Sequence, residues 1–156
     1  MTENRWKIFV HHKPRVTDHR GDGIRKECAH AGLKSVKKVR AGQAYEVAGS
    51  LLEAEARRLA ESLLTDPVTQ EAWIAVPGGV KAPAGARLVQ VWPKNGVSDP
   101  VADTVRMAAK DLKIEGLDTV RSGSVFEFFG AARTDDVRRF CEEHLMNGLI
   151  QIVELS

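Results

Sequence analysis

Hydrophobic and polar positions alternate most clearly in the second half of the chain. Four short runs there are rich in the β-branched and aromatic residues that favour strands. These runs are 88–92, 117–122, 125–129 and 149–155. Apolar residues recur at helical spacing over 101–112, after the helix opening Ser98-Asp99-Pro100, and over 137–145, after Thr134-Asp135-Asp136. The pattern predicts strand, helix, strand, strand, helix, strand, with the middle hairpin turning at Gly123.

The first half of the chain shows the same order of elements. The predicted segments are a strand over 6–12, a helix over 18–32, a hairpin over 36–48 that turns near Ala41-Gly42, a helix over 51–64 and a strand over 68–76. Gly21 and Gly23 weaken the first of these helices. A β-α-β-β-α-β order with both helices on one sheet face is the ferredoxin-like α+β pattern.

The two halves are copies of one unit. Shifting the chain by 81 positions aligns Asp18 with Asp99 without a gap and gives 14 identities in 60 aligned pairs, where chance gives about 3 to 5. The ten residues 77–86 hold two prolines and three glycines, a composition typical of a linker. The sequence therefore predicts a first repeat over 1–76, a linker over 77–86 and a second repeat over 87–156.

Both faces of the predicted sheet carry apolar residues that have to be buried. Phe126 and Phe128 share one face of their strand, while Val125 and Phe129 share the other with Glu127. A sheet that is apolar on both faces requires a packing partner on each, and the sister repeat is the nearest one. We expect two tandem ferredoxin-like repeats that pack as an intramolecular pseudo-dimer through their sheets.

The histidines do not form a metal-binding pattern. His11 and His12 are neighbours at a strand end, so their side chains point to opposite faces. His30 stands alone on a helix, and His144 aligns with Leu63 of the first repeat. No metal site is predicted.

Other catalytic patterns are equally weak. Cys28 aligns with Ala109 and Cys141 with Ala60, exchanges that indicate buried structural cysteines. The glycine-rich segments 21–23 and 77–79 lack the lysine and Ser/Thr of a phosphate-binding loop. The sequence predicts no catalytic residue and no bound cofactor.

Charge and composition describe a globular chain. Of its 156 residues 43% are hydrophobic and 28% charged, and no apolar run approaches the ~20 residues of a membrane helix. A polar start without a signal-peptide pattern and only two cysteines lead us to expect a cytoplasmic protein. Residues 1–40 hold eleven Lys or Arg against four acids; this excess either steers an anionic ligand or acidic partner, or is a solvated face.

One motif is kept in both repeats: Val39-Arg40-Ala41-Gly42 and Val120-Arg121-Ser122-Gly123, followed by Glu46 and Glu127. In one interpretation the glycine serves a hairpin turn, and the arginine and glutamate form a cross-strand pair. In the other, each arginine is displayed for an anion or a partner. The candidate partner-binding residues are Arg40, Gly42, Arg121 and Gly123.

These motifs resemble the PurS family, the small subunit of phosphoribosylformylglycinamidine synthase in bacterial purine biosynthesis. The resemblance rests on the V-R-x-G motifs, the following glutamates, and the Asp18 and Asp99-Pro100 positions, and it covers both repeats. It implies a non-catalytic subunit that bridges a glutaminase subunit and a synthetase subunit, which would use glutamine and ATP. The fused pair would replace a homodimer, and the arginine hairpins and sheet edges would contact the larger subunits. The family commonly has lysine where this chain has Gln43 and Ser124, and His19 stands where the second repeat has Pro100.

Other functions on a duplicated ferredoxin-like fold stay open. A regulatory module would bind a small ligand between the repeats, and an acylphosphatase-like hydrolase is suggested by fold alone. An RNA-binding module would need exposed aromatics beside basic residues, for which Trp6 and Phe9 are candidates. Phe126, Phe128 and Phe129 lie too deep in the pattern for that role, so nucleic acid is not the expected partner. Further homo-oligomerisation also stays open.

Overall fold

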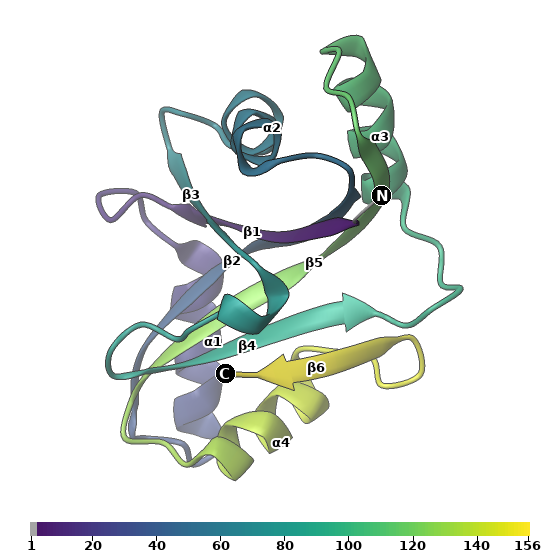
Figure 1. Cartoon of the computed structure of the whole chain (residues 1–156). Helices are drawn as coiled ribbons and strands as arrows, with labels where there is room; N and C mark the ends of the chain where they lie inside the picture. Colours follow the sequence, from purple (N-terminus) through teal and green to yellow (C-terminus); the bar gives the residue numbers. More distant parts are fainter. Residues whose placement is uncertain (1–2) are drawn as a thin grey trace.

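A computed structural model describes residues 3–156 and shows one six-stranded antiparallel sheet in the order β3-β1-β2-β5-β4-β6. The elements are β1 (Asn4–His12), α1 (His19–His30), β2 (Val36–Gly49), α2 (Glu53–Leu59), the π-helical turn η1 (Ala60–Leu64), β3 (Gln70–Ala75), the 3₁₀ turn η2 (Pro77–Gly79), β4 (Ala86–Pro93), α3 (Pro100–Asp111), β5 (Leu117–Gly130), α4 (Thr134–His144) and β6 (Gln151–Leu155). Two β-α-β-β-α-β-like units thus share a single sheet (Figure 1), which confirms the predicted pseudo-dimer. Within the described residues, no helix is long and apolar enough to cross a membrane.

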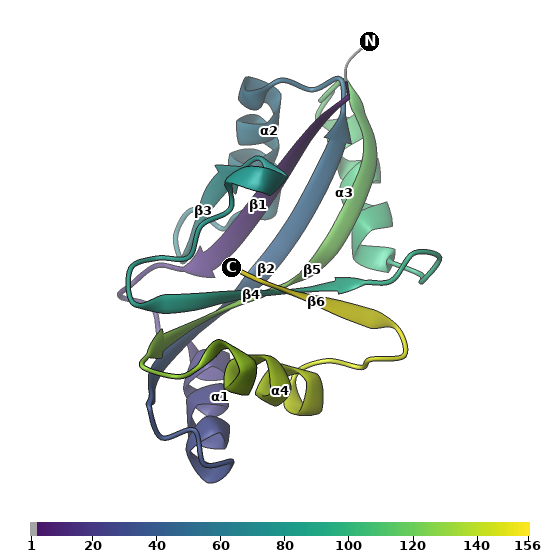
Figure 2. The ribbon, with the colours of Figure 1, turned by 60° about the horizontal axis from the view of Figure 1, so that its bottom comes forward.

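The predicted hairpins are wrong, because each is one continuous strand. Gly42 lies in the middle of β2, and Gly123 lies in the middle of β5. Neither glycine has the positive φ that tight hairpin turns require. The two strands instead pair with each other along their whole length, from Val36 opposite Gly130 to Gly49 opposite Leu117. Figure 2 shows them side by side through the centre of the sheet.

Each long strand serves both ends of the sheet. Residues 42–49 of β2 lie between β1 and β5, whereas residues 124–129 of β5 lie between β4 and β2. The paired positions are centred on Gln43 opposite Ser124, two residues that are themselves 81 positions apart. A pseudo-twofold axis therefore passes between these two residues and relates the repeats.

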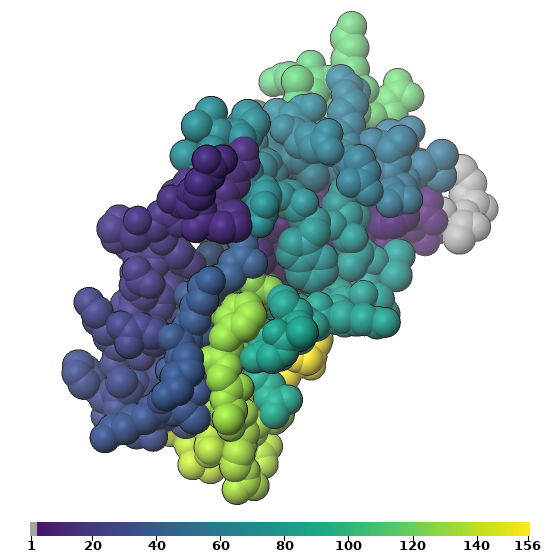
Figure 3. All heavy atoms as spheres, turned by 90° about the vertical axis from the view of Figure 1, so that its left-hand side faces the viewer, coloured from purple at the N-terminus to yellow at the C-terminus, as the bar shows by residue number. Residues whose placement is uncertain are grey.

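The repeats exchange elements to build two shared cores. One, the α2/α3 core, packs Leu59 and Val105 of these helices against Tyr45 and Val120 of the long strands. The other, the α1/α4 core, packs Ile24 and Phe140 against Val39 and Phe126. Each core takes one helix from each repeat, so neither repeat has a hydrophobic core of its own. Figure 3 shows a side of the molecule where first-repeat atoms lie directly against those near residue 130.

All four helices cover one face of the sheet. The residues of β2 that enter the two helical cores, from Val39 to Val47, are all odd-numbered and so share a face. Twist carries the helix pairs to opposite ends of the molecule, with α2 and α3 at the top of Figure 1 and α1 and α4 at the bottom.

The linker covers the other sheet face. Phe9, Ala44, Leu88, Trp92 and Val125 form a buried cluster there. Trp73 of β3 and the linker residues Val80 and Ala82 pack against this cluster. The chain between β3 and β4 crosses in front of the sheet in Figure 1. We call this side the linker face.

Helix starts follow local chemistry, with one difference from expectation at α4. Asp18 and Asp99 cap α1 and α3 through bonds from the backbone N–H groups of Gly21 and Ala102. No side chain caps α4, which starts after Arg133; Asp135 and Asp136 lie in its first turn, where the helix dipole favours negative charge.

Candidate functional site

The four predicted residues lie on the linker face of the two central strands, with the glycines near the pseudo-twofold axis and the arginines farther out on either side. Arg40 and Gly42 are on β2, and Arg121 and Gly123 are on the adjacent β5. Arg40 stands opposite Glu127, and Glu46 stands opposite Arg121. The motif positions therefore face each other between the repeats, not within each repeat as one interpretation expected, and of these two facing pairs only Arg40 and Glu127 form an ion pair in the described chain.

The two glycines permit close packing under a neighbouring strand. A Cβ atom on Gly42 would lie 2.3 Å from the Val10 carbonyl oxygen and 2.9 Å from the His11 ring. A Cβ atom on Gly123 would lie 2.3 Å from the Val91 oxygen and 2.8 Å from the Trp92 ring. These contacts, and not a turn, explain why both repeats have glycine here.

The helix-capping aspartates also fix the strand beside each arginine. Asp18 Oδ2 accepts a 2.8 Å bond from the backbone N–H of Ala41, the residue after Arg40. Asp99 accepts equivalent bonds from the N–H (2.7 Å) and hydroxyl (2.6 Å) of Ser122. One carboxylate thus anchors the start of a helix and the position of an arginine on the sheet.

Arg40 is neutralised inside the protein. Its guanidinium donates a 3.1 Å bond to Glu127 Oε1 and lies 3.5 Å from Glu71 Oε1. The Glu127 side chain is only 1% exposed. His11 Nε2 lies 3.6 Å from the same Glu127 oxygen. A bound anion would have to compete with these two carboxylates for Arg40.

Burial shifts both titratable groups beside Arg40 toward their neutral forms. Burial and, second to it, the nearby Arg40 charge lower the pKa of His11 from 6.5 to about 4. Burial also raises the pKa of Glu127, although the contact with Arg40 works in the opposite direction. His11 is therefore neutral near pH 7, and its contact with Glu127 is not an ion pair.

Arg121, the counterpart of Arg40, has a different environment. Its guanidinium carbon lies 4.8 Å from the centre of the Trp92 ring, a cation–π contact. Within residues 3–156 no carboxylate forms an ion pair with it, and its buried Nε has no hydrogen-bond partner. Glu46, which stands opposite, lies 3.5 Å from Arg5 instead. Arg121 is therefore the uncompensated member of the pair.

Three exchanges between the repeats accompany this difference, because Arg5, His11 and Glu71 align with Ala86, Trp92 and Ile152. Trp92 occupies the position that His11 holds in the first repeat, 81 residues earlier. Trp92 is fully buried and donates a 3.1 Å bond to Gln90 Oε1, which also accepts a 2.8 Å bond from Lys7 Nζ. Lys7 in turn lies 3.0 Å from Glu154 on β6. The sequence did not predict this buried polar network. The alternation of residues in β1 could have placed Lys7 on the same face as Phe9, but it could not show that Lys7 meets Gln90 and Glu154.

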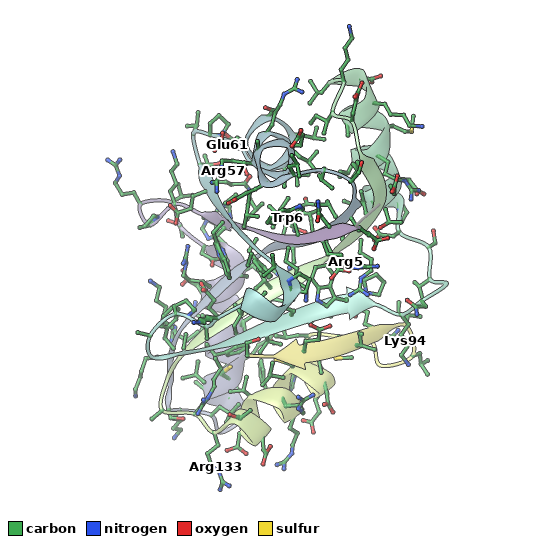
Figure 4. All side chains as sticks on the ribbon, in the orientation of Figure 1. Arg5, Trp6, Arg57, Glu61, Lys94 and Arg133 are labelled. Atoms are coloured by element: carbon green, nitrogen blue, oxygen red, sulfur yellow. The ribbon has the colours of Figure 1, made fainter. Side chains whose placement is uncertain are left out.

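Two surface cavities occupy equivalent places at the ends of the first strands. One, of about 280 Å³, is lined by residues that include Lys13, Asp18, Asp22, Lys38 and Arg40. The other, of about 350 Å³, has Lys94, Asp99, Asp103, Arg106 and Arg121 in its lining. Figure 4 labels Lys94 at the end of β4. Each motif arginine thus reaches a cavity beside the start of a helix.

The remaining predicted residues are structural. Burial raises the pKa of Cys28 to about 11 and that of Cys141 to about 12, so neither thiol is poised as a nucleophile. Phe9, Phe126 and Phe128 are at most 1% exposed, so they form no stacking platform for RNA. Among the residues described, no three His, Cys, Asp or Glu side chains are grouped as metal ligands.

Comparisons with known proteins find the same family in both repeats. Residues 5–77 and 87–156 match the family PurS, described as phosphoribosylformylglycinamidine (FGAM) synthase. PurS of Bacillus subtilis is 20% identical, with a TM-score of 0.43 over 48% of this chain and 98% of that one. The PurS subunit of FGAM synthase from Thermotoga maritima is 25% identical, with a TM-score of 0.42 over 48% and 92%. For Methanocaldococcus jannaschii PurS the values are 19%, 0.40, 51% and 100%. No curated protein matches the chain.

Proposed function

Because the chain belongs to the PurS family twice over, with one family segment in each repeat, we propose that it is a non-catalytic subunit of FGAM synthase that bridges the glutaminase and synthetase subunits. In that complex the partner subunits use glutamine and ATP, and this chain holds neither. The observation that carries the proposal is the pair of family segments joined through one pseudo-symmetric sheet.

The organisation of the sheet supports a bridging role. Its two edge strands, β3 and β6, belong to different repeats and lie at opposite ends of the strand order. An edge strand offers backbone groups and side chains to a second protein. One chain therefore presents two separate outer surfaces, as a bridge between two larger subunits needs.

The chemistry of the central residues also supports a structural role. Arg40, Glu127 and Asp18 satisfy one another or the backbone inside the fold. His11 is held neutral, and both cysteines are buried with raised pKa values. Arg40 and Glu127 join the two repeats, and Asp18 joins α1 to β2 within the first repeat.

The test is reconstitution with the glutaminase and synthetase subunits of the same organism. We expect the three proteins to elute together from a sizing column, and glutamine-dependent FGAM formation to require this chain. Ammonia-dependent activity of the synthetase alone is the control for its integrity. Separate elution together with full glutamine-dependent activity in the absence of this chain would overturn the proposal.

A further inference from the structure

The motif arginine of the second-repeat cavity, Arg121, has no carboxylate partner among the described residues, whereas Arg40 in the first-repeat equivalent has two. Arg121 forms no ion pair within the described chain, and its Nε is buried without a partner. Lys94 donates to the Gly148 carbonyl, and Arg106 is paired with Asp103, so Arg121 is the guanidinium left for an external acceptor. A planar guanidinium in this state donates paired hydrogen bonds to a carboxylate.

The surface next to this cavity carries an exposed apolar side chain, Met107, in the second repeat only. A wider depression of about 550 Å³ shares Asp103 and Arg106 with the cavity and continues past Met107 to Ile114 and Leu117. Met107 is 69% exposed. The first repeat has the exposed Lys26 at that position. An exposed methionine beside a depression is a feature of surfaces that bind protein side chains.

We propose that these two adjoining depressions, from Arg121 to Met107, form the docking surface for a segment of a partner subunit that presents a carboxylate beside apolar side chains. The carboxylate pairs with Arg121, and the apolar side chains cover Met107. This inference rests on the proposed bridging function and assigns one contact of the bridge to the second repeat.

The charges around Arg121 favour a protein carboxylate over a phosphate ligand. Asp99 and Asp103 also line the cavity. Lys94, Arg106 and Arg121 stand against these two aspartates, and a single carboxylate balances this excess of one positive charge, whereas a phosphate dianion exceeds it. Arg40 already has Glu127 and Glu71 as partners. The surfaces around Arg40 and Arg121 are therefore unequal, and the two repeats are expected to contact different partner subunits.

The experiment measures the affinity of the full chain for each isolated larger subunit by titration calorimetry. Arg121→Gln should weaken binding to one subunit by about 10-fold or more, and Met107→Lys, which copies the first repeat, by about 5-fold. Val101→Arg also copies the first repeat, but Val101 lines neither depression; its affinity should stay within about twofold of the wild type. Raising the salt concentration should weaken the wild type more than Arg121→Gln.

Each outcome decides a separate question. Unchanged binding by Arg121→Gln, while the wild type binds, overturns this inference and leaves the bridging function intact. An equal loss in Val101→Arg also overturns it, because the effect would then not be specific to the depressions. Wild-type protein that binds neither subunit overturns the bridging function and this inference together. Because Arg121 packs on Trp92, Arg121→Lys is the second variant: with the charge kept, it should lose less affinity than Arg121→Gln.

Discussion

Arg40 and Arg121 occupy equivalent positions on a pseudo-symmetric sheet, yet only Arg40 is neutralised. Arg40 contacts the buried Glu127, whereas Arg121 lies against Trp92 and has no carboxylate within the described chain. The backbone is alike on both sides of the axis, so the side chains around each arginine make the difference. Duplication preserved the scaffold, whereas the side chains at the positions of Arg5, His11 and Glu71 differ between the two repeats.

The largest expected effect comes from removing the side chain that distinguishes the second repeat. Trp92 is fully buried on the linker face, so Trp92→Ala should lower the free energy of unfolding by about 4 kcal/mol. His11→Ala, at the equivalent position, should cost less because the imidazole is smaller. Urea denaturation followed by circular dichroism measures both. Equal losses would show that the two positions do not differ in the way described.

The next largest effect is a loss of stability at acid pH that comes from His11 in the first repeat. Folding lowers the pKa of His11 from 6.5 to about 4, so the unfolded state binds its proton more readily in that range. The stability contributed by neutral His11 is present above pH 6.5 and is lost as the pH falls toward 4, by roughly 3 kcal/mol.

His11→Phe isolates this acid effect, because it keeps a buried ring and removes the titration. The wild type should lose more stability than this variant between pH 6.5 and 4. Glu127 acts in the opposite direction: its raised pKa means that its carboxyl group stabilises the fold at low pH and less as the pH rises. Parallel pH profiles of wild type and His11→Phe would contradict the assignment to His11.

Sequence reasoning found the scaffold because its signals are local or periodic. The 81-residue shift identified the repeats, and the alternation over 125–129 correctly placed Phe126 and Val125 on opposite faces. The aspartates at 18 and 99 correctly marked the helix starts. These features depend on residues that are close in the chain or duplicated.

The sequence could not exclude the hairpins, because it does not distinguish a glycine that forms a tight turn from a glycine that lets a neighbouring side chain pack on a continuous strand. The choice depends on Val10 and Val91, whose carbonyl oxygens lie where a Cβ on Gly42 or Gly123 would be. The pairing of Arg40 with Glu127 likewise joins residues 87 positions apart. That Arg40 is paired and Arg121 is not can be recognised only when the position of Trp92 beneath Arg121 is known.

The central glycines should respond alike in both repeats, unlike the arginines. Gly42→Ala and Gly123→Ala each place a Cβ 2.3 Å from a backbone oxygen of the neighbouring strand. We expect each to lower the free energy of unfolding by about 2 kcal/mol, since the backbone has to move. Chemical denaturation measures the loss, and Gly78→Ala, with nothing within 4 Å, is the matched control. A neutral result at either central position would show that its strand does not need glycine.

The smallest effect distinguishes the two glycines of α1, both of which the sequence marked as weak points of the helix. A Cβ atom on Gly23 would meet no neighbouring atom within 4 Å, so Gly23→Ala should raise the free energy of unfolding by about 0.5–1 kcal/mol. Gly21→Ala should instead lower it, because a Cβ there would lie 2.2 Å from the Val39 carbonyl oxygen. The equivalent residue in α3 is Ala102, which is buried without strain on the fold. Opposite signs of the two changes in thermal unfolding are expected if α1 contacts the sheet closely at Gly21 and not at Gly23, and equal signs would contradict this.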